Sequence, residues 1–307
     1  MNMMNRCARV LIVYFLSSCF SVSFDLEAFA REPAPGPARV VSLAPSVTET
    51  LFALGFGDRL VGVTTSCDFP AEARKIPKIG GFMSPSLETI IAKRPDLVIG
   101  ASSATDPAKA REMKRLGLKV TLISLASVSD ILTSIKSIAV LLGNAESGER
   151  LADKITREID QVQRRVAAAP LRSTLLVVGL RPLIAVGGRN FIDELITLAG
   201  GKNIAGDAAQ SWLNLPDEYV VAQAPQVIIV AGMGSERAES AKHWADLKSI
   251  PAVEQRRVYN YPSDAILRPG PRIGEGLEEI ARLVHPECFA EAKGGLNKGS
   301  GCERSRP

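Results

Sequence analysis

The sequence of 307 residues predicts an α/β protein in which two similar αβ lobes are joined by one long rigid helix. Three observations favour this fold class. Short runs of β-branched residues alternate with helical patterns. One sequence segment, called the repeated phrase below, occurs at 87–99 and again at 217–229, and a long amphipathic segment lies between the two copies. Together they predict, in each half of the chain, a parallel sheet that is covered by helices.

The first thirty residues are typical of a secretory signal peptide. Arg6 and Arg9 precede the apolar stretch 10–24, and a small-x-small site ends at Ala30. The apolar stretch is shorter than a membrane-spanning helix needs. A competing cleavage site lies at Cys19, where the sequence LSSC resembles a lipobox whose cysteine is lipidated. Either site predicts a periplasmic protein, with a lipid anchor only in the second case.

The composition narrows the class of function. A hydrophobic content of 46% is enough for two cores, and the formal net charge of +4 gives no support to nucleic-acid binding. Without the signal peptide the chain keeps Cys67, Cys288 and Cys302, an odd number for an oxidising compartment. Cys288 and Cys302 are placed to close a loop. No CxxC pair or Cys/His cluster stands out, so we expect no metal site.

Residues 31–144 are predicted to form the first lobe, after a proline-rich lead-in at 31–38 that suits neither a helix nor a central strand. The sequence Ser46-Val47-Thr48-Glu49 is typical of a capping box that opens a helix ending near Gly55 and Gly57. Apolar runs and helical periodicity predict strands at 40–43, 61–64, 97–99 and 120–123, and helices at 86–93, 107–116 and 129–142.

Residues 145–170 are predicted as a linker helix, because apolar residues recur there at helical spacing and no glycine follows Gly148. A helix over 146–169 would be about 35 Å long. It would leave few residues free to act as a hinge. The alternative is an ordinary amphipathic helix inside one domain. The recurring apolar residues are Leu151, Ile155, Ile159, Val162 and Val166.

Residues 171–286 are predicted to form the second lobe and 287–307, rich in Gly, Lys and Ser, a disordered tail. The sequence of residues 191–201 is similar to that of residues 47–57, and Glu194 occupies the place of Glu49. The expected strands lie at 175–178, 227–229 and 258–261, and the expected helices at 236–244 and 273–284.

The repeated phrase covers 87–99 and 217–229, and the spacing between the copies suits two similar domains better than a solenoid. Glu88 and Glu218 occupy the same place in the two copies, as do Pro95 and Pro225. The alternative is that any two αβ units look alike, since apolar runs after a proline are common in parallel sheets. That alternative leaves the matched glutamates unexplained.

Loops at strand ends are the expected binding surface of αβ lobes. Phe82 and Trp212 lie in loops, each just before a helix of the repeated phrase. Two aromatic rings at equivalent points of two lobes would contact a flat, partly apolar ligand bound between them. The alternative is that each ring fills its own core. The other candidates in such loops are Ser66 and Cys67 after one strand, and Asp264 and Arg268 after the last strand, whereas Arg272 has a structural role in this interpretation.

With these residues assembled, the chain resembles the periplasmic substrate-binding proteins of ABC importers for vitamin B12 and iron-siderophores, and most of all the vitamin B12-binding members. The markers are RVVSLAPSVTETLFALG, VGVTTSCDFP, SLETIIAKRPDLVIG, AGGKNI and RPGPR, within about 39–286. The resemblance implies two lobes, one rigid connecting helix and a ligand held between the lobes. It also implies that Glu88 and Glu218 form salt bridges with arginines of a permease dimer that works with ATPase subunits.

The resemblance implies cobalamin or a related corrinoid as the transported ligand, with no cofactor and a monomeric protein. Of the aromatic positions that line the cleft in the family, Phe82 and Trp212 stay aromatic, whereas Ser66, Ala101, Ile184 and Ala265 do not. Leu267 replaces an acidic residue and Arg268 is retained. The alternatives are a ferric siderophore or heme, and, more remotely, an enzyme on a related chelatase-like fold. No catalytic motif favours an enzyme.

Overall fold

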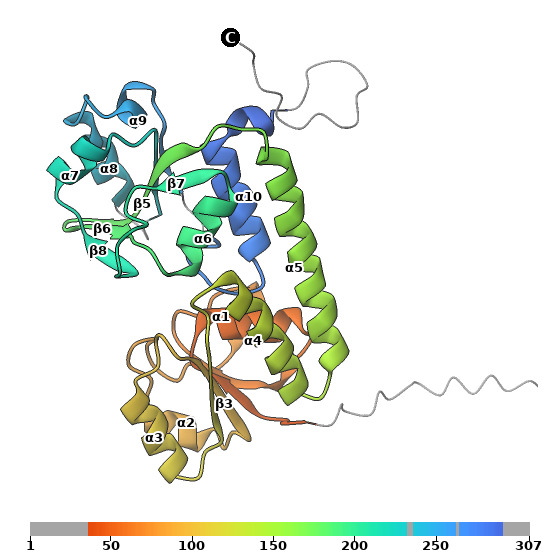
Figure 1. Ribbon diagram of the computed structural model, residues 1–307. Coiled ribbons are helices and arrows are strands. Elements are labelled where there is room, and N and C mark those ends of the chain that lie inside the picture. The colour runs from red at the N-terminus through yellow and green to blue at the C-terminus, as the bar shows by residue number, and fades with distance from the viewer. Residues whose placement is uncertain (1–35, 232–235, 262–263, 291–307) are drawn as a thin grey trace, which may run out of the picture. The chain divides into compact units, whose positions relative to one another are not determined.

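Two β-sheets, each with helices packed on it, carry the fold (Figure 1). The structure is a computed structural model and describes residues 36–231, 236–261 and 264–290. The predicted signal peptide 1–30, with Cys19 and Ala30, and the distal cysteine Cys302 lie outside the described residues. Both sheets belong to one compact unit.

The first lobe is a four-stranded parallel sheet in the order β2-β1-β3-β4. Its strands are β1 (Val40–Ser42), β2 (Leu60–Val63), β3 (Leu97–Ala101) and β4 (Val120–Ile123). Its helices are α1 (Pro45–Ala53), α2 (Leu87–Ala92), α3 (Pro107–Arg115) and α4 (Val128–Leu141), with short 3-10 turns at η1 (Gly57–Arg59) and η2 (Ala71–Lys75). The strands and helices predicted for this half are therefore confirmed.

The second lobe has strands in the order β10-β9-β5-β6-β8, with β7 beside β5. Its strands are β5 (Arg172–Leu180), β6 (Leu183–Val186), β7 (Gly201–Asn203), β8 (Trp212–Asn214), β9 (Val227–Val230) and β10 (Val258–Asn260). Its helices are α6 (Phe191–Leu198), α7 (Asp217–Gln223), α8 (Glu236–Ala245), α9 (Pro251–Glu254) and α10 (Ile273–Val284), with a 3-10 turn at η3 (Pro286–Cys288).

The expectation of a purely parallel second sheet is wrong. β6 runs antiparallel to both β5 and β8, so this sheet is mixed. The reason is the short turn at Arg181 and Pro182, which returns the chain as a hairpin and needs no crossover helix. Trp212, which we expected in a loop, is the first residue of β8.

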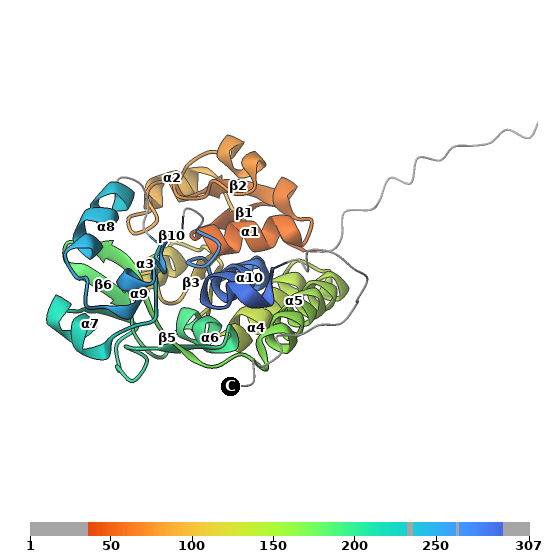
Figure 2. The same cartoon turned by 90° about the horizontal axis from the view of Figure 1, so that it is seen from above.

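The predicted long helix is confirmed as α5 (Ala145–Val166), a helix of 22 residues that the Asn144 side chain caps. It lies beside α4 and α10 in both views (Figures 1 and 2). A Cβ atom on Gly148 would lie 2.6 Å from the Cβ of Ala139 on α4, so the one early glycine permits close packing. Close packing along the helix leaves it little freedom to bend.

The repeated phrase folds into the same local geometry in both lobes. Arg94 and Ala224, which occupy the same place in the two copies, both adopt a left-handed backbone with φ of 45°. This conformation is uncommon for residues other than glycine. Beyond the following proline, the backbone N–H of Asp96 donates to Arg39 and that of Gln226 donates to Ser173, each over 2.8 Å. The repeat is therefore a helix, a left-handed turn and a strand in both lobes.

Two further expectations need correction. The predicted capping box does not form, because α1 begins at Pro45 and no side chain caps it. Proline suits the first helical position, so the helix starts before Ser46 and Glu49 lies inside it. The predicted tail also begins too early, because Glu287 pairs with Arg172 over 2.9 Å and Phe289 packs under the guanidinium of Arg165. The tail beyond residue 290 lies outside the described residues.

Candidate functional site

A cavity of about 380 Å³ is lined by residues of both lobes. The first lobe contributes Ser46 at the start of α1 and Phe82 in the loop before α2. The second lobe contributes Asn190 at the start of α6, Trp212 on β8 and Arg268 after β10. The volume is in the range of small-molecule sites, and the position at strand ends is where αβ lobes bind ligands.

The structure brings Phe82 and Trp212 together at this cavity. Phe82 is partly buried and packs against a hydrophobic core cluster that contains residues of both lobes. Trp212 keeps 47% of its surface exposed, although it lies on a strand. An exposed indole at the wall of a cavity offers an apolar face to a ligand. Trp212 is thus not a core residue in this structure.

Among the other sequence candidates, Cys67, Ser66 and Ile184 do not line the cavity. Cys67 is 1% exposed, and its Sγ lies 3.2 and 3.1 Å from the hydroxyls of Thr48 and Thr64. Ser66 is exposed and presents its carbonyl oxygen to Arg268. Ile184 lies on β6, beside the backbone of Gly179. Cys67 and Ile184 thus have contacts away from the cavity, whereas Ser66 contacts Arg268, which lines it.

Arg268, which lines the cavity, belongs to an ionic network. The Arg268 side chain is 12% exposed and contacts the carboxylates of Glu49, Asp68 and Asp264, with distances of 2.8 Å to Glu49 and 2.7 Å to Asp68. Arg272 binds the same Glu49 over 2.7 Å and Asp264 over 3.2 Å. Asp264 therefore belongs to the network rather than to the lining.

The network favours the charged forms of Arg268 and Asp68. Burial alone would lower the pKa of Arg268, but the hydrogen bonds and charges of Glu49, Asp68 and Asp264 outweigh it and raise that pKa. Burial alone would raise the pKa of Asp68, but the hydrogen bond and charge of Arg268 hold it below its usual range. Arg268 is consequently a cation that is already paired and held in one orientation.

A second arginine, which was not predicted from the sequence, lies at the cavity. Arg189 lines it from the turn between β6 and α6, where its backbone is left-handed with φ of 56°. The next residue, Asn190, accepts hydrogen bonds from the backbone N–H groups of Ile192 and Asp193 and so caps α6. Within the described residues no carboxylate pairs with Arg189. The Gly-Gly-Arg-Asn turn before the helix was the available signal.

Glu88 and Glu218 lie away from the cavity lining, on the solvent side of α2 and α7. Each is in the first turn of its helix, where the helix dipole favours a negative charge. Neither carboxylate has an ion-pair partner in the described part of the chain. Both are therefore available to a partner outside this chain.

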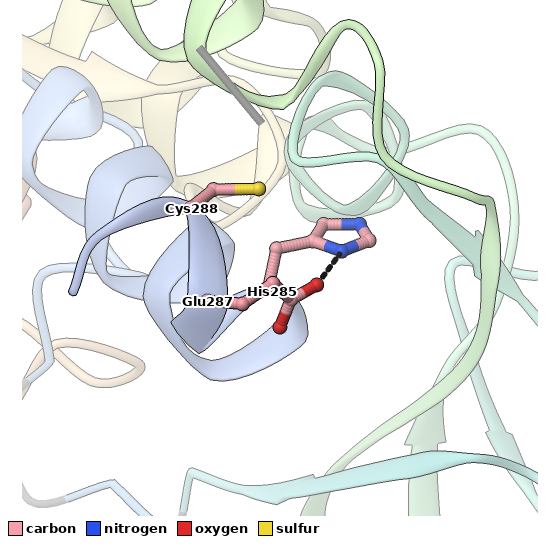
Figure 3. Close-up of side chains that lie close together, drawn as sticks. All are labelled: His285, Glu287 and Cys288. Carbon is pink, nitrogen blue, oxygen red and sulfur yellow. Dashed lines mark hydrogen bonds and ion pairs between the residues drawn. The ribbon is translucent and has the colours of Figure 1, made fainter. Parts of the chain in front are cut away.

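A cluster near the end of α10 joins His285, Glu287 and Cys288, whose ligand atoms lie within 4.8 Å of one another (Figure 3). The His285 Nδ1 is 3.3 Å from Glu287, and its Nε2 is 3.1 Å from the carbonyl oxygen of Gly200. Burial alone would raise the pKa of Glu287, but the hydrogen bond and charge of Arg172 lower it. Both carboxylate oxygens contact Arg172, whose charge opposes a metal cation, so we interpret the cluster as structural.

Among the described helices, none combines the length and the apolar composition that a membrane span requires.

The sequence matches the periplasmic binding protein family over residues 40–265, more than half of the chain. It is 32% identical over 267 residues to an ABC transporter substrate-binding lipoprotein of Bacillus subtilis, covering 83% of this chain and 82% of the relative. It is 30% identical over 246 residues to a vitamin B12-binding protein of Salmonella paratyphi A, covering 80% of this chain and 90% of the relative.

Among solved structures, the fold is similar to that of the periplasmic heme-binding protein of Roseiflexus sp. RS-1. The TM-score is 0.74 at 29% identity, with 82% of this chain and 100% of that chain covered. The resemblance identified from the sequence motifs is thereby confirmed, and the family is one of substrate-binding proteins rather than of enzymes. The two lobes, the helix that connects them and these relatives place the chain in the periplasmic binding protein family, as the substrate-binding component of an ABC importer.

Proposed function

We propose that this protein captures a corrinoid such as cobalamin and delivers it to an ABC permease dimer with its ATPase subunits. The observation that carries the proposal is that Phe82 and Trp212, from different lobes, line one cavity. A corrin ring is a flat macrocycle with apolar faces, which suits contact with aromatic rings on both sides. The vitamin B12-binding relative at 30% identity supports the same ligand class.

A second candidate ligand is heme or a ferric siderophore, and Arg189 is the observation that favours it. Arg189 is exposed, lines the cavity and has no carboxylate partner within the described residues. Heme carries two carboxylates, which pair well with a guanidinium. The heme-binding protein of Roseiflexus, at 29% identity, supports this alternative.

The docking part of the proposal rests on Glu88 and Glu218. They occupy equivalent places on α2 and α7, and each is exposed. Two equivalent carboxylates on one chain match a permease dimer whose two subunits are related by a two-fold axis. One copy of the protein then engages both subunits, so we propose that it works as a monomer.

We propose that the protein works in the periplasm after cleavage at Ala30, with lipidation at Cys19 as the alternative. The lipoprotein of Bacillus subtilis supports the lipid anchor, and the periplasmic family supports an extracytoplasmic location. Mass spectrometry of the mature N-terminus separates the two, since lipidation adds the mass of acyl chains.

Isothermal titration of the mature protein with cyanocobalamin, heme and a ferric siderophore tests the ligand. We expect cyanocobalamin to bind at one site per chain. If heme or the siderophore saturates the protein while cyanocobalamin gives no heat, the second candidate replaces the first. Conversion of any ligand in the absence of permease would favour an enzyme instead.

Arg189→Ala sharpens the distinction between the two ligand classes. Cyanocobalamin carries no net charge, so its affinity should change by less than about threefold, as for a weakly coupled exposed charge. The affinity for heme should fall about tenfold, because the substitution removes a charge-assisted hydrogen bond to a heme carboxylate. A large loss for cyanocobalamin would contradict the proposed mode of binding.

A further inference from the structure

Two exposed aliphatic side chains occupy matching places in the repeated phrase, as the two docking glutamates do. Ile91 on α2 is 41% exposed and Val221 on α7 is 37% exposed. The residues just before them, Ile90 and Val220, are both 0% exposed. Each helix therefore has a buried aliphatic anchor followed by an exposed aliphatic residue at the same place of the repeat.

The exposed aliphatic residues lie beside the glutamates. Ile91 follows Glu88 by three residues, and Val221 follows Glu218 by three. Residues three apart in a helix are neighbours on one face. Each lobe thus presents a carboxylate and a β-branched side chain together to solvent, and neither Ile91 nor Val221 belongs to a core cluster of the described residues.

Fold stability does not explain this pairing. A β-branched residue on an exposed helix face is a poorer helix former than alanine or lysine. Its apolar surface stays in contact with water, so it contributes no hydrophobic stabilisation to the fold. Single exposed apolar residues are common and need no explanation. Leu116 and Val140 are of that kind, since both lie outside the repeated phrase and have no matching exposed partner among the described residues of the second lobe. Ile91 and Val221 differ because they match each other.

We infer that Ile91 and Val221 are apolar contacts of the permease docking surface, each fitting a hydrophobic depression beside the basic group that receives Glu88 or Glu218. This inference rests on the proposed docking function and adds to it. The carboxylates supply long-range attraction that salt screens, whereas the aliphatic contacts supply short-range affinity that salt does not weaken. The two kinds of contact therefore have separable signatures.

The matched geometry favours the permease over a second copy of this chain. A copy that set α2 of one molecule against α7 of another would bring Glu88 and Glu218 together, and like charges repel. A two-fold permease with basic groups presents two equivalent acceptors instead. The occupant of this surface is thus a symmetric, basic and partly apolar partner.

The test measures binding to the cognate permease and ATPase complex in lipid nanodiscs, by biolayer interferometry at about 50 and 300 mM salt. We expect Ile91→Ala with Val221→Ala to weaken binding about tenfold at both salt concentrations, mainly through faster dissociation. Glu88→Gln with Glu218→Gln should weaken it most at low salt. Leu116→Ala with Val140→Ala is the matched control and should stay within about twofold.

The outcomes separate this inference from the function on which it rests. If the aliphatic double variant binds like wild type while the glutamine double variant fails, docking stands and the apolar contact is wrong. If neither pair affects binding, the docking proposal itself fails. If sedimentation shows a wild-type dimer that the aliphatic variant abolishes, the partner is a second copy and the inference is overturned.

Discussion

Arg272 holds the carboxylate of Glu49 through two hydrogen bonds, from Nε over 2.7 Å and from Nη2 over 2.9 Å. Glu49 lies on α1 of the first lobe and is 1% exposed, whereas Arg272 stands at the start of α10 in the second lobe. Arg268 adds a third bond to the same carboxylate over 2.8 Å. A buried ionic contact therefore joins the two lobes next to the cavity.

Glu49→Gln should lower the free energy of unfolding by about 3 kcal/mol, because removing one partner of a buried ion pair leaves the other poorly compensated. Because Asp264 and Asp68 still contact the two arginines in this variant, the loss of stability should lie at the lower end of the range for buried ion pairs. Urea unfolding measures it.

Glu146→Gln is the matched control, since the Glu146 side chain is 81% exposed and forms an ion pair with Arg150 on the helix surface. Its loss should be below about 1 kcal/mol. Equal effects of the two substitutions would show that the buried network does not stabilise the fold.

The contact between Asp68 and Arg268 should make stability depend on acid pH. The folded-state pKa of Asp68 is lowered from 3.8, so its contribution is present above that value and is lost as pH falls through the folded pKa. Asp68→Asn should destabilise by about 0.2 to 1 kcal/mol at pH 7, because this carboxylate is half exposed. The difference from wild type should shrink below about pH 4 in urea unfolding. A difference that stays constant with pH would contradict the ionic origin.

Glu88 and Glu218 should matter for transport and hardly for ligand binding, since neither lines the cavity. Replacing both by alanine removes the charges that we propose pair with permease arginines, and charge-assisted contacts at an interface are worth a few kcal/mol. Uptake by reconstituted vesicles should collapse while ligand affinity stays within about twofold. Each single variant should keep part of the activity, because the other lobe still docks. Normal transport by the double variant would leave the matched glutamates without a function.

Elements with strong local signals could be predicted from the sequence. The predicted ranges 120–123 and 273–284 coincide with β4 and α10, because apolar periodicity and flanking turn residues define both. Trp212 could not be placed on a strand, since β8 has three residues and forms only by pairing with β6.

The role of Glu49 could not be predicted either. The Ser-x-x-Glu spacing satisfies a local capping pattern, whereas the partners of Glu49, Arg268 and Arg272, are 219 and 223 residues away. Arg189 was missed for a similar reason, since only the fold places its turn at the cavity that Phe82 also lines. Contacts at long sequence separation thus decide the site, and local patterns decide the elements.

The most direct test is the affinity of Trp212→Ala and Phe82→Ala for cyanocobalamin, measured by isothermal titration. If both rings contact the corrin, each substitution should weaken binding by about 1 to 3 kcal/mol, which is roughly 5- to 150-fold. Val140→Ala, an exposed apolar residue on α4 outside the cavity lining, should leave the affinity unchanged. Wild-type affinity in both aromatic variants would contradict the claim that this cavity binds the corrinoid.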